Sequence, residues 1–178
     1  MFQTSISSAT AVTQFLQKSL NVHSCDNLAF MTIHFNKPKQ DVYSAKEYAR
    51  SIYSRMLNQL QGKYWHKHPL PSVSIIEHGK TNVFHVHSIF NLCEHSLPKL
   101  DIALSNTCHK YPYLYLTYDM QYTNFAQSNN YSPVMNHLLV REVFNTNVYG
   151  YITKEYNLNL NNIDFLNLWT SDMLFKLS

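Results

Sequence analysis

The segment Val73–Asn91 reads VSIIEHGKTNVFHVHSIFN, and the rest of the chain can be organised around it. Two apolar runs, 73–76 and 83–90, flank a polar loop that contains Gly79. Runs rich in β-branched and aromatic residues on either side of such a loop are typical of a β-hairpin. The sequence therefore predicts two neighbouring antiparallel strands in this segment.

The predicted hairpin carries residue types that bind metals. His85 and His87 are two residues apart, so on a strand both imidazoles project from the same face. Glu77 ends the first run and can come opposite them. Two neutral imidazoles and one carboxylate would form a half-open site for Mn²⁺ or Mg²⁺. We expect exposed ligands, so that alanine at either histidine leaves the fold largely intact; the alternative is an ordinary surface or core histidine pair.

Two further segments carry residues that suit the same chemistry. In GYITKEY, Tyr151 and Lys154 are three residues apart and would share one face of a helix. In FMTIHF, residues 30–35, a strand would place Thr32 and His34 on one face. His34 can lie near the metal site, or it can be a hydrogen-bonded core histidine.

In this order the motifs resemble the HUH endonuclease superfamily, and within it the rolling-circle replication initiators (Rep proteins) with one catalytic tyrosine. The resemblance rests on Glu77, on His85-Val86-His87 and on Tyr151-x-x-Lys154. Residues 30–35 resemble the first motif of these proteins loosely, and the resemblance covers roughly residues 29–156. It implies that the glutamate and both histidines bind the metal, that the tyrosine is the nucleophile, and that the lysine offsets charge on the phosphate or positions the metal's water.

The resemblance also implies an activity: metal-dependent, site-specific nicking and joining of single-stranded DNA through a 5′-phosphotyrosine. Such an enzyme would initiate rolling-circle replication of a plasmid or virus, acting as a monomer or dimer on an origin hairpin or nick site. Gly79-Lys80-Thr81 is not a phosphate-binding loop, because Ser74 stands where that motif needs a glycine. A separate helicase is therefore expected.

Three alternatives remain open. A relaxase of the same superfamily usually carries its tyrosine before the histidine motif, whereas Tyr151 follows it. A small HUH transposase usually has a glutamine where this chain has Lys154. A non-catalytic protein that binds single-stranded nucleic acid on the same fold would need neither residue. The motif order favours the Rep type.

The totals indicate one globular domain. The chain has 178 residues, 45% of them hydrophobic and 14% aromatic, which is enough for a core. We expect a single HUH domain over 1–178, with its core at about 28–156 and with an N-terminal helical segment and an Asn-rich C-terminal tail packed on it. Three cysteines without Cys-x-x-Cys spacing, and no apolar run of membrane length, predict a cytoplasmic protein of the host cell with no membrane partner.

Basic residues gather in one part of the chain. Between residues 37 and 67 there are seven Lys or Arg against two acidic residues, whereas the whole chain has a net charge of +3. Cations and an aromatic ring together suit single-stranded DNA, for phosphate contacts and base stacking. The expected DNA contacts are Lys46, Arg50, Lys63, Trp65 and Lys67. The alternative is a solvated helix face, with the tryptophan anchored in the core.

The periodicity of apolar residues predicts an α/β (α+β) fold. Its expected form is a ferredoxin-like or RRM-like antiparallel sheet of four or five strands with helices packed on it. The histidine strand should be central, with Glu77 on its neighbour. Beyond the hairpin, strands are predicted at 28–35 and 111–122. Helices are predicted at 7–20, from a capping box at 44–47 to Gly62, at 98–110, at 132–144 and around 147–154, and the chain after 156 should form a packed tail or short helix.

Overall fold

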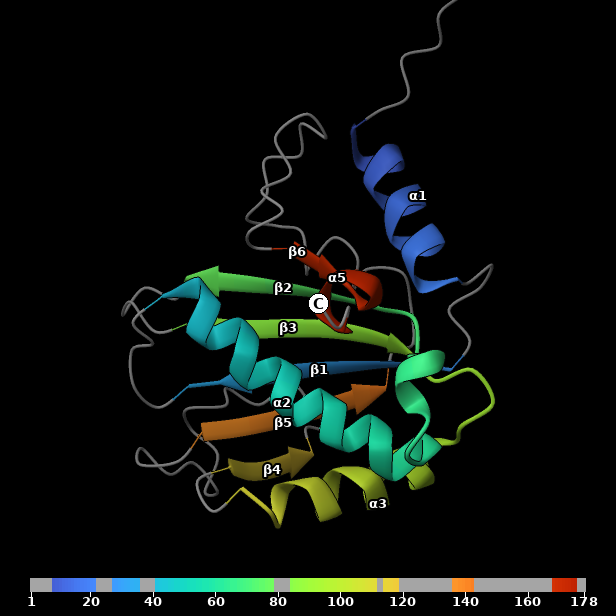
Figure 1. Ribbon diagram of the computed structural model, residues 1–178. Helices are drawn as coiled ribbons and strands as arrows, with labels where there is room; N and C mark the ends of the chain where they lie inside the picture. The colour runs from blue at the N-terminus through green and yellow to red at the C-terminus, as the bar shows by residue number, and fades with distance from the viewer. Residues whose placement is uncertain are drawn as a thin grey trace, which may run out of the picture.

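The computed structural model describes residues 8–21, 27–35, 41–78, 84–111, 114–118, 136–142 and 168–175. Within these ranges, six strands form one sheet in the order β4-β5-β1-β3-β2-β6 (Figure 1). All neighbouring strands are antiparallel except β4 and β5, which are parallel. The α+β class is confirmed, and the histidine strand β3 is central, next to β2. The strands are β1 (Leu28–His34), β2 (Ser72–His78), β3 (Phe84–Asn91), β4 (Leu114–Tyr118), β5 (Asn136–Glu142) and β6 (Leu168–Thr170).

Helix α2 crosses one face of the sheet, and α3 lies beside it (Figure 1). The carboxylate of Asp41 accepts a hydrogen bond of 2.6 Å from the backbone N–H of Ser44, so Asp41 caps α2 three residues before the predicted capping box. Gly62, with φ of 83°, ends the helix as predicted. The helices are α1 (Ser8–Leu20), α2 (Val42–Gln61), α3 (Leu97–Cys108) and α5 (Ser171–Phe175), with a 3₁₀ turn, η1 (Trp65–Lys67).

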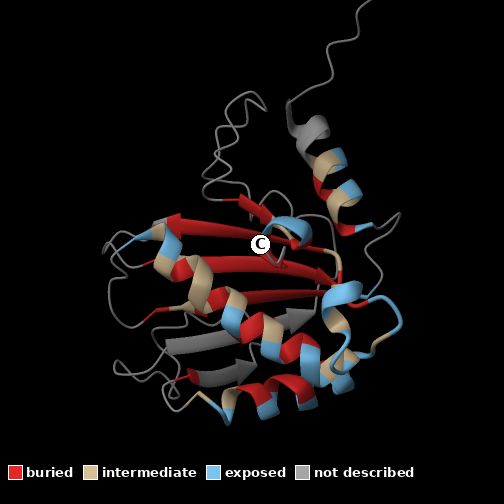
Figure 2. Ribbon diagram, in the orientation of Figure 1, coloured by how far each residue is buried: buried red, intermediate tan, exposed pale blue. Residues whose placement is uncertain are grey.

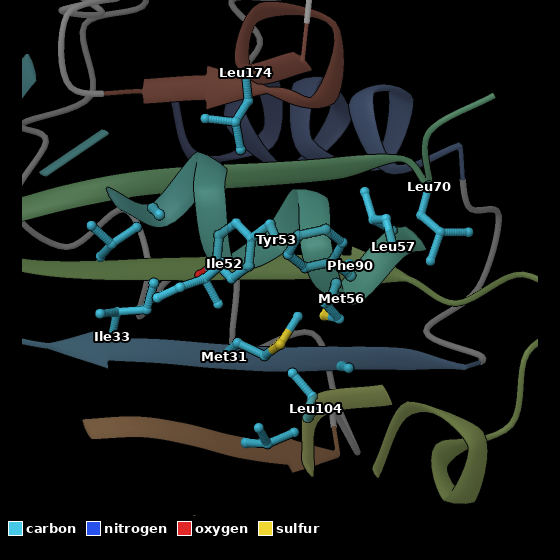
Figure 3. Packing of buried hydrophobic residues seen from close by; sticks show 14 of the residues in the cluster. Met31, Ile33, Ile52, Tyr53, Met56, Leu57, Leu70, Phe90, Leu104 and Leu174 are labelled. Carbon is cyan, nitrogen blue, oxygen red and sulfur yellow. The ribbon is translucent and has the colours of Figure 1, made fainter. Parts of the chain in front are cut away.

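The main core lies between α2, α3 and the sheet (Figure 3). Alternate residues of β1, such as Met31 and Ile33, face the apolar stripe of α2 and are fully buried. Each large aliphatic side chain buried in this way stabilises the fold by roughly 1.5–3 kcal/mol. Figure 2 shows β1, β2 and β3 buried along most of their length. Residues on the opposite face of these strands, such as Ile75 and Ile89, are fully buried as well.

A chain of buried hydroxyl groups fixes the histidine strand to the helix layer. The Tyr53 hydroxyl lies 2.8 Å from Ser88 Oγ, and Ser74 Oγ lies 2.8 Å from the same atom. Burial raises the pKa of Tyr53, so its phenol stays neutral. These bonds join α2, β3 and β2 directly beneath the strand that carries His85 and His87.

The predicted helix at 132–144 is wrong in the part that the structure describes, because residues 136–142 form strand β5. In register, Leu138 lies opposite Ile33 and Val140 lies opposite Met31. Pairing with the open edge of β1 outweighs the helix-start signal of Ser132-Pro133. Strand pairing between segments this far apart cannot be recognised from the local sequence, which is equally compatible with a helix.

The end of the chain is folded back onto the sheet. Residues 168–170 pair with β2 as β6, and α5 follows directly, so the predicted short C-terminal helix is present while the strand before it was not predicted. The N-terminal helix is also present, as α1. No helix among the described residues is long and apolar enough to cross a membrane. The predicted helix around 147–154 lies outside the described residues.

Candidate metal centre

Five polar residues of three adjacent strands share the face of the sheet opposite α2. In register, His34 of β1 lies opposite His85 of β3, which lies opposite Glu77 of β2. Two positions further along, Thr32 lies opposite His87. Directly opposed residues project from the same face, and so do residues two apart along one strand. The alternate residues of β1 belong to the core under α2, which places this set on the other face.

Glu77 and His87 are in direct contact in the buried part of this face. Glu77 Oε2 lies 3.2 Å from His87 Nε2, and the two residues are 4% and 3% exposed. A ring-nitrogen lone pair and a carboxylate oxygen repel each other, so at this distance a proton or a cation must lie between them. Removing a carboxylate from water costs several kcal/mol without such a partner. The pair can therefore provide two ligands of a cation site.

Two further contacts hold the ring of His87. Thr32 Oγ1 lies 2.8 Å from His87 Nδ1. The ring of Phe30 is stacked on the imidazole, with ring centroids 5.6 Å apart and planes at 16°. Histidines that bind metals usually hold their second ring nitrogen in a hydrogen bond of this kind. The expectation that His87 is exposed is therefore wrong, because its ring is buried and held by these two contacts.

The other two imidazoles lie at the more exposed side of the set. His34 and His85 are both half-buried, and their ring centroids are 4.4 Å apart, with planes at 59°. The rings of His85 and His87 are 6.3 Å apart. Glu77 and His87 are thus the buried members of the set, and His34 and His85 are the more exposed ones.

The donor set fits a divalent metal. Neighbouring ligands in an octahedral complex with bonds of about 2.1 Å are about 3 Å apart, close to the 3.2 Å between Glu77 and His87. Among the described residues, no group of three His, Cys, Asp or Glu side chains is arranged so that it could hold a metal ion. An ion bound here would therefore require side chains of this face to move closer together.

The predicted nucleophile and its partner, Tyr151 and Lys154, lie outside the described residues. Their place beside Glu77 and His87 stays a prediction. A further residue of a type that binds metals lies in register with the five residues described above: His137 of β5 pairs with His34 of β1. Sequence reasoning missed this histidine, since the segment around it was assigned to a helix.

The predicted DNA contacts in α2 lie on the other side of the sheet from Glu77. Lys46 Nζ lies 5.3 Å from the centroid of the Trp169 ring. Arg50 forms a pair with Glu47 one turn earlier, at 3.5 Å. The alternative of a solvated helix face fits the arginine, and the structure does not bring these two cations to the candidate metal centre.

In the loop after α2 the exposed aromatic residue is Tyr64, whereas the sequence analysis expected Trp65 to contact DNA. Trp65 packs edge-on against Phe175, with ring centroids 5.2 Å apart, which agrees with the alternative that it anchors the loop. Tyr64 is 59% exposed instead. The ammonium groups of Lys63 and Lys67 lie 4.8 and 5.1 Å from the centroid of its ring. The loop thus presents an exposed aromatic ring with two cations close to it.

The chain was compared with protein-family models, with curated proteins and with solved structures, and none of these matches it. Function therefore has to be inferred from the residues on the sheet face. Thr32 and Phe30 are the supporting residues that sequence reasoning left without a role, because nothing local indicates that β1 pairs with β3.

Thr32→Val should weaken metal binding without unfolding the protein. Valine keeps the shape but removes the hydroxyl that holds His87 Nδ1, and loss of such a supporting bond typically costs about 10–100-fold in affinity. Titration calorimetry with Mn²⁺ measures this. Thr107→Val is the matched control, because that buried hydroxyl donates a hydrogen bond of 2.7 Å to Ala103 O in its own helix. Equal Mn²⁺ affinity in both variants would remove Thr32 from the site.

Proposed function

We propose that this chain is a metal-dependent endonuclease of the HUH type that nicks and rejoins single-stranded DNA, as a rolling-circle initiator of a plasmid or virus. The observation that supports it best is the buried contact between Glu77 and His87, with Thr32 on the second ring nitrogen. Such a buried pair is weak evidence for stability. Polar groups that interrupt an apolar interior are expected at functional sites.

In the proposed reaction the phenol oxygen of Tyr151 attacks the phosphorus of a phosphodiester. The new bond from tyrosine oxygen to phosphorus replaces the bond from phosphorus to O3′. The 5′ end of the cut strand is then attached to the protein, and the other fragment leaves with a 3′-hydroxyl. The phenol loses its proton in the attack, and the departing O3′ takes one up. Attack by a 3′-hydroxyl on the phosphotyrosine reverses these steps and rejoins the strand.

The residues of the site have separate tasks in this reaction. Glu77, His87 and His85 hold the divalent ion, which when bound supplies Lewis-acid stabilisation of charge on the phosphate. Thr32 fixes the ring of His87. Lys154, one turn from the nucleophile on the predicted helix, offsets negative charge that develops on the phosphate. A phenol has a reference pKa of about 10, so ionisation near neutral pH needs this electrostatic help.

A second candidate is a non-catalytic protein that binds single-stranded nucleic acid. It is favoured by Tyr64, whose exposed ring lies close to the ammonium groups of Lys63 and Lys67. Stacking on an aromatic ring and contacts from cations to phosphates are sufficient for such binding. This function requires neither Glu77 nor His87, so dependence on a metal distinguishes the two candidates.

The test is incubation with a pool of single-stranded oligonucleotides, in Mn²⁺ and in excess chelator, followed by a denaturing gel. Each oligonucleotide should carry different dyes at its two ends. The proposed chemistry attaches the 3′-end dye to the protein and releases a shorter fragment with the 5′-end dye, which a polymerase can extend. No adduct with any sequence, together with metal-independent retention of the pool, would favour the binding protein.

Lys63→Gln with Lys67→Gln should lower the salt dependence of DNA binding. Each phosphate contact to a single strand contributes about 0.7 to the slope of log affinity against log salt, so the slope should fall by about 1.4. Fluorescence anisotropy across a salt series measures it. Lys99→Gln with Lys110→Gln is the matched control, since both lysines are exposed on or beside α3. Equal slopes for the two double variants would show that the loop after α2 does not contact DNA.

A further inference from the structure

A third histidine, His34, lies on the same face of the sheet as the three residues that the proposed function assigns to the metal. His34 is the last residue of β1, and it pairs in register with His85, as His85 does with Glu77. Three adjacent strands thus place two imidazoles and a carboxylate side by side on one face, with His87 two positions along. Directly opposed side chains have Cβ atoms about 4.5–5.5 Å apart, which is within reach of a shared ion.

The spacing of the two paired rings is that of neighbouring metal ligands. With a metal–nitrogen bond of about 2.1 Å, the ring centre lies about 3.2 Å from the ion, so two ligands at right angles have ring centres about 4.5 Å apart. The rings of His34 and His85 are 4.4 Å apart. Their planes are tilted by 59°, so the rings are not stacked face to face. Both rings are half-buried.

We propose that His34 is a third imidazole ligand of the metal centre, which then consists of Glu77, His34, His85 and His87. This inference rests on the proposed function only in so far as that function requires a metal at Glu77 and His87. It adds a residue from β1, so that the ion joins all three central strands. His34 thereby acquires a role beyond packing against His85.

The proposed ligand set has a consequence for the choice of metal. Mg²⁺ prefers oxygen ligands and keeps several waters, whereas imidazole nitrogen suits first-row transition ions. Three imidazoles and one carboxylate therefore select Mn²⁺, Co²⁺ or Zn²⁺ over Mg²⁺. Without His34, two nitrogens and one oxygen discriminate less between Mn²⁺ and Mg²⁺.

The experiment compares His34→Ala with the parent protein in the full chain and without DNA. Titration calorimetry should show Mn²⁺ affinity reduced at least about tenfold, and Mg²⁺ affinity changed by less than about twofold. Pulsed electron paramagnetic resonance of bound Mn²⁺ should show three imidazole nitrogens in the parent and two in the variant. His109→Ala, an exposed histidine after α3, should match the parent in both measurements.

The outcomes separate this inference from the proposed function. Two coordinated imidazoles in the parent, with Mn²⁺ affinity unchanged in His34→Ala, overturn the role of His34 and leave the metal pair in place. A parent protein that binds neither ion overturns the metal centre and the proposed function with it. If His34→Ala fails to fold, His34→Gln fills the same space with a polar group that is a poor ligand, and the same loss of one nitrogen signal is expected.

Discussion

Tyr151→Phe should abolish the covalent protein–DNA adduct while single-stranded DNA binding stays within about twofold of the parent. The substitution removes only the hydroxyl that attacks phosphorus, so the ring and its contacts remain. Loss of a nucleophile typically lowers the rate on the order of 10³-fold or more, which is below detection on a gel. The adduct assay with the double-labelled oligonucleotide gives the first quantity, and fluorescence anisotropy gives the second.

Tyr149→Phe is the matched control for this prediction. Two residues on a helix turn the side chain by about 200°, so the predicted helix points Tyr149 and Tyr151 in nearly opposite directions. Tyr151 would share its face with Lys154, whereas Tyr149 would share its face with Ile152. Tyr149→Phe should therefore react at nearly the parental rate. Mass spectrometry of the adduct peptide decides between them, and a nucleotide on Tyr149 or Tyr156 would overturn the assignment.

The histidine hairpin shows what could be predicted from the sequence. The apolar runs at 73–76 and 83–90, with the Gly-containing loop between them, predicted two antiparallel strands, and β2 and β3 form in those places. The two-residue period of a strand also placed His85 and His87 on one face. The contact between Glu77 and His87 needs only this hairpin, because both residues belong to strands that are neighbours in the chain.

The rest of the site depends on pairing between segments far apart in sequence. Thr32 reaches His87 only because β1 pairs with β3, and no local pattern indicates which strands will be neighbours. The same limit explains β5, whose segment reads locally as a helix but fills the open edge of β1. Burial was misjudged for a related reason: the ring of His87 is covered by Phe30, a residue more than fifty positions earlier.

Alanine at His85 and at His87 should have equal effects on nicking but different effects on stability. Each removes a proposed ligand, so each should reduce Mn²⁺-dependent cleavage on the order of 100-fold or more. His87→Ala should also lower the free energy of unfolding of the metal-free protein by roughly 3–5 kcal/mol, because it leaves the buried carboxylate of Glu77 without the imidazole. His85→Ala should lower it by less than about 1 kcal/mol, since that ring is half-buried. Urea denaturation in chelator measures the difference.

A second substitution tests the physical cause of that difference. Glu77→Gln in the His87→Ala background should recover part of the lost stability, because a neutral amide is less costly to bury than an unbalanced carboxylate. The same change made alone should remove metal-dependent cleavage, since an amide oxygen is a weaker ligand than a carboxylate. If His85→Ala and His87→Ala both nick DNA at the parental rate, the metal role is wrong. If instead they lose cleavage but are equally stable, then Glu77 is held by other groups in the metal-free protein, and His87 serves the ion alone.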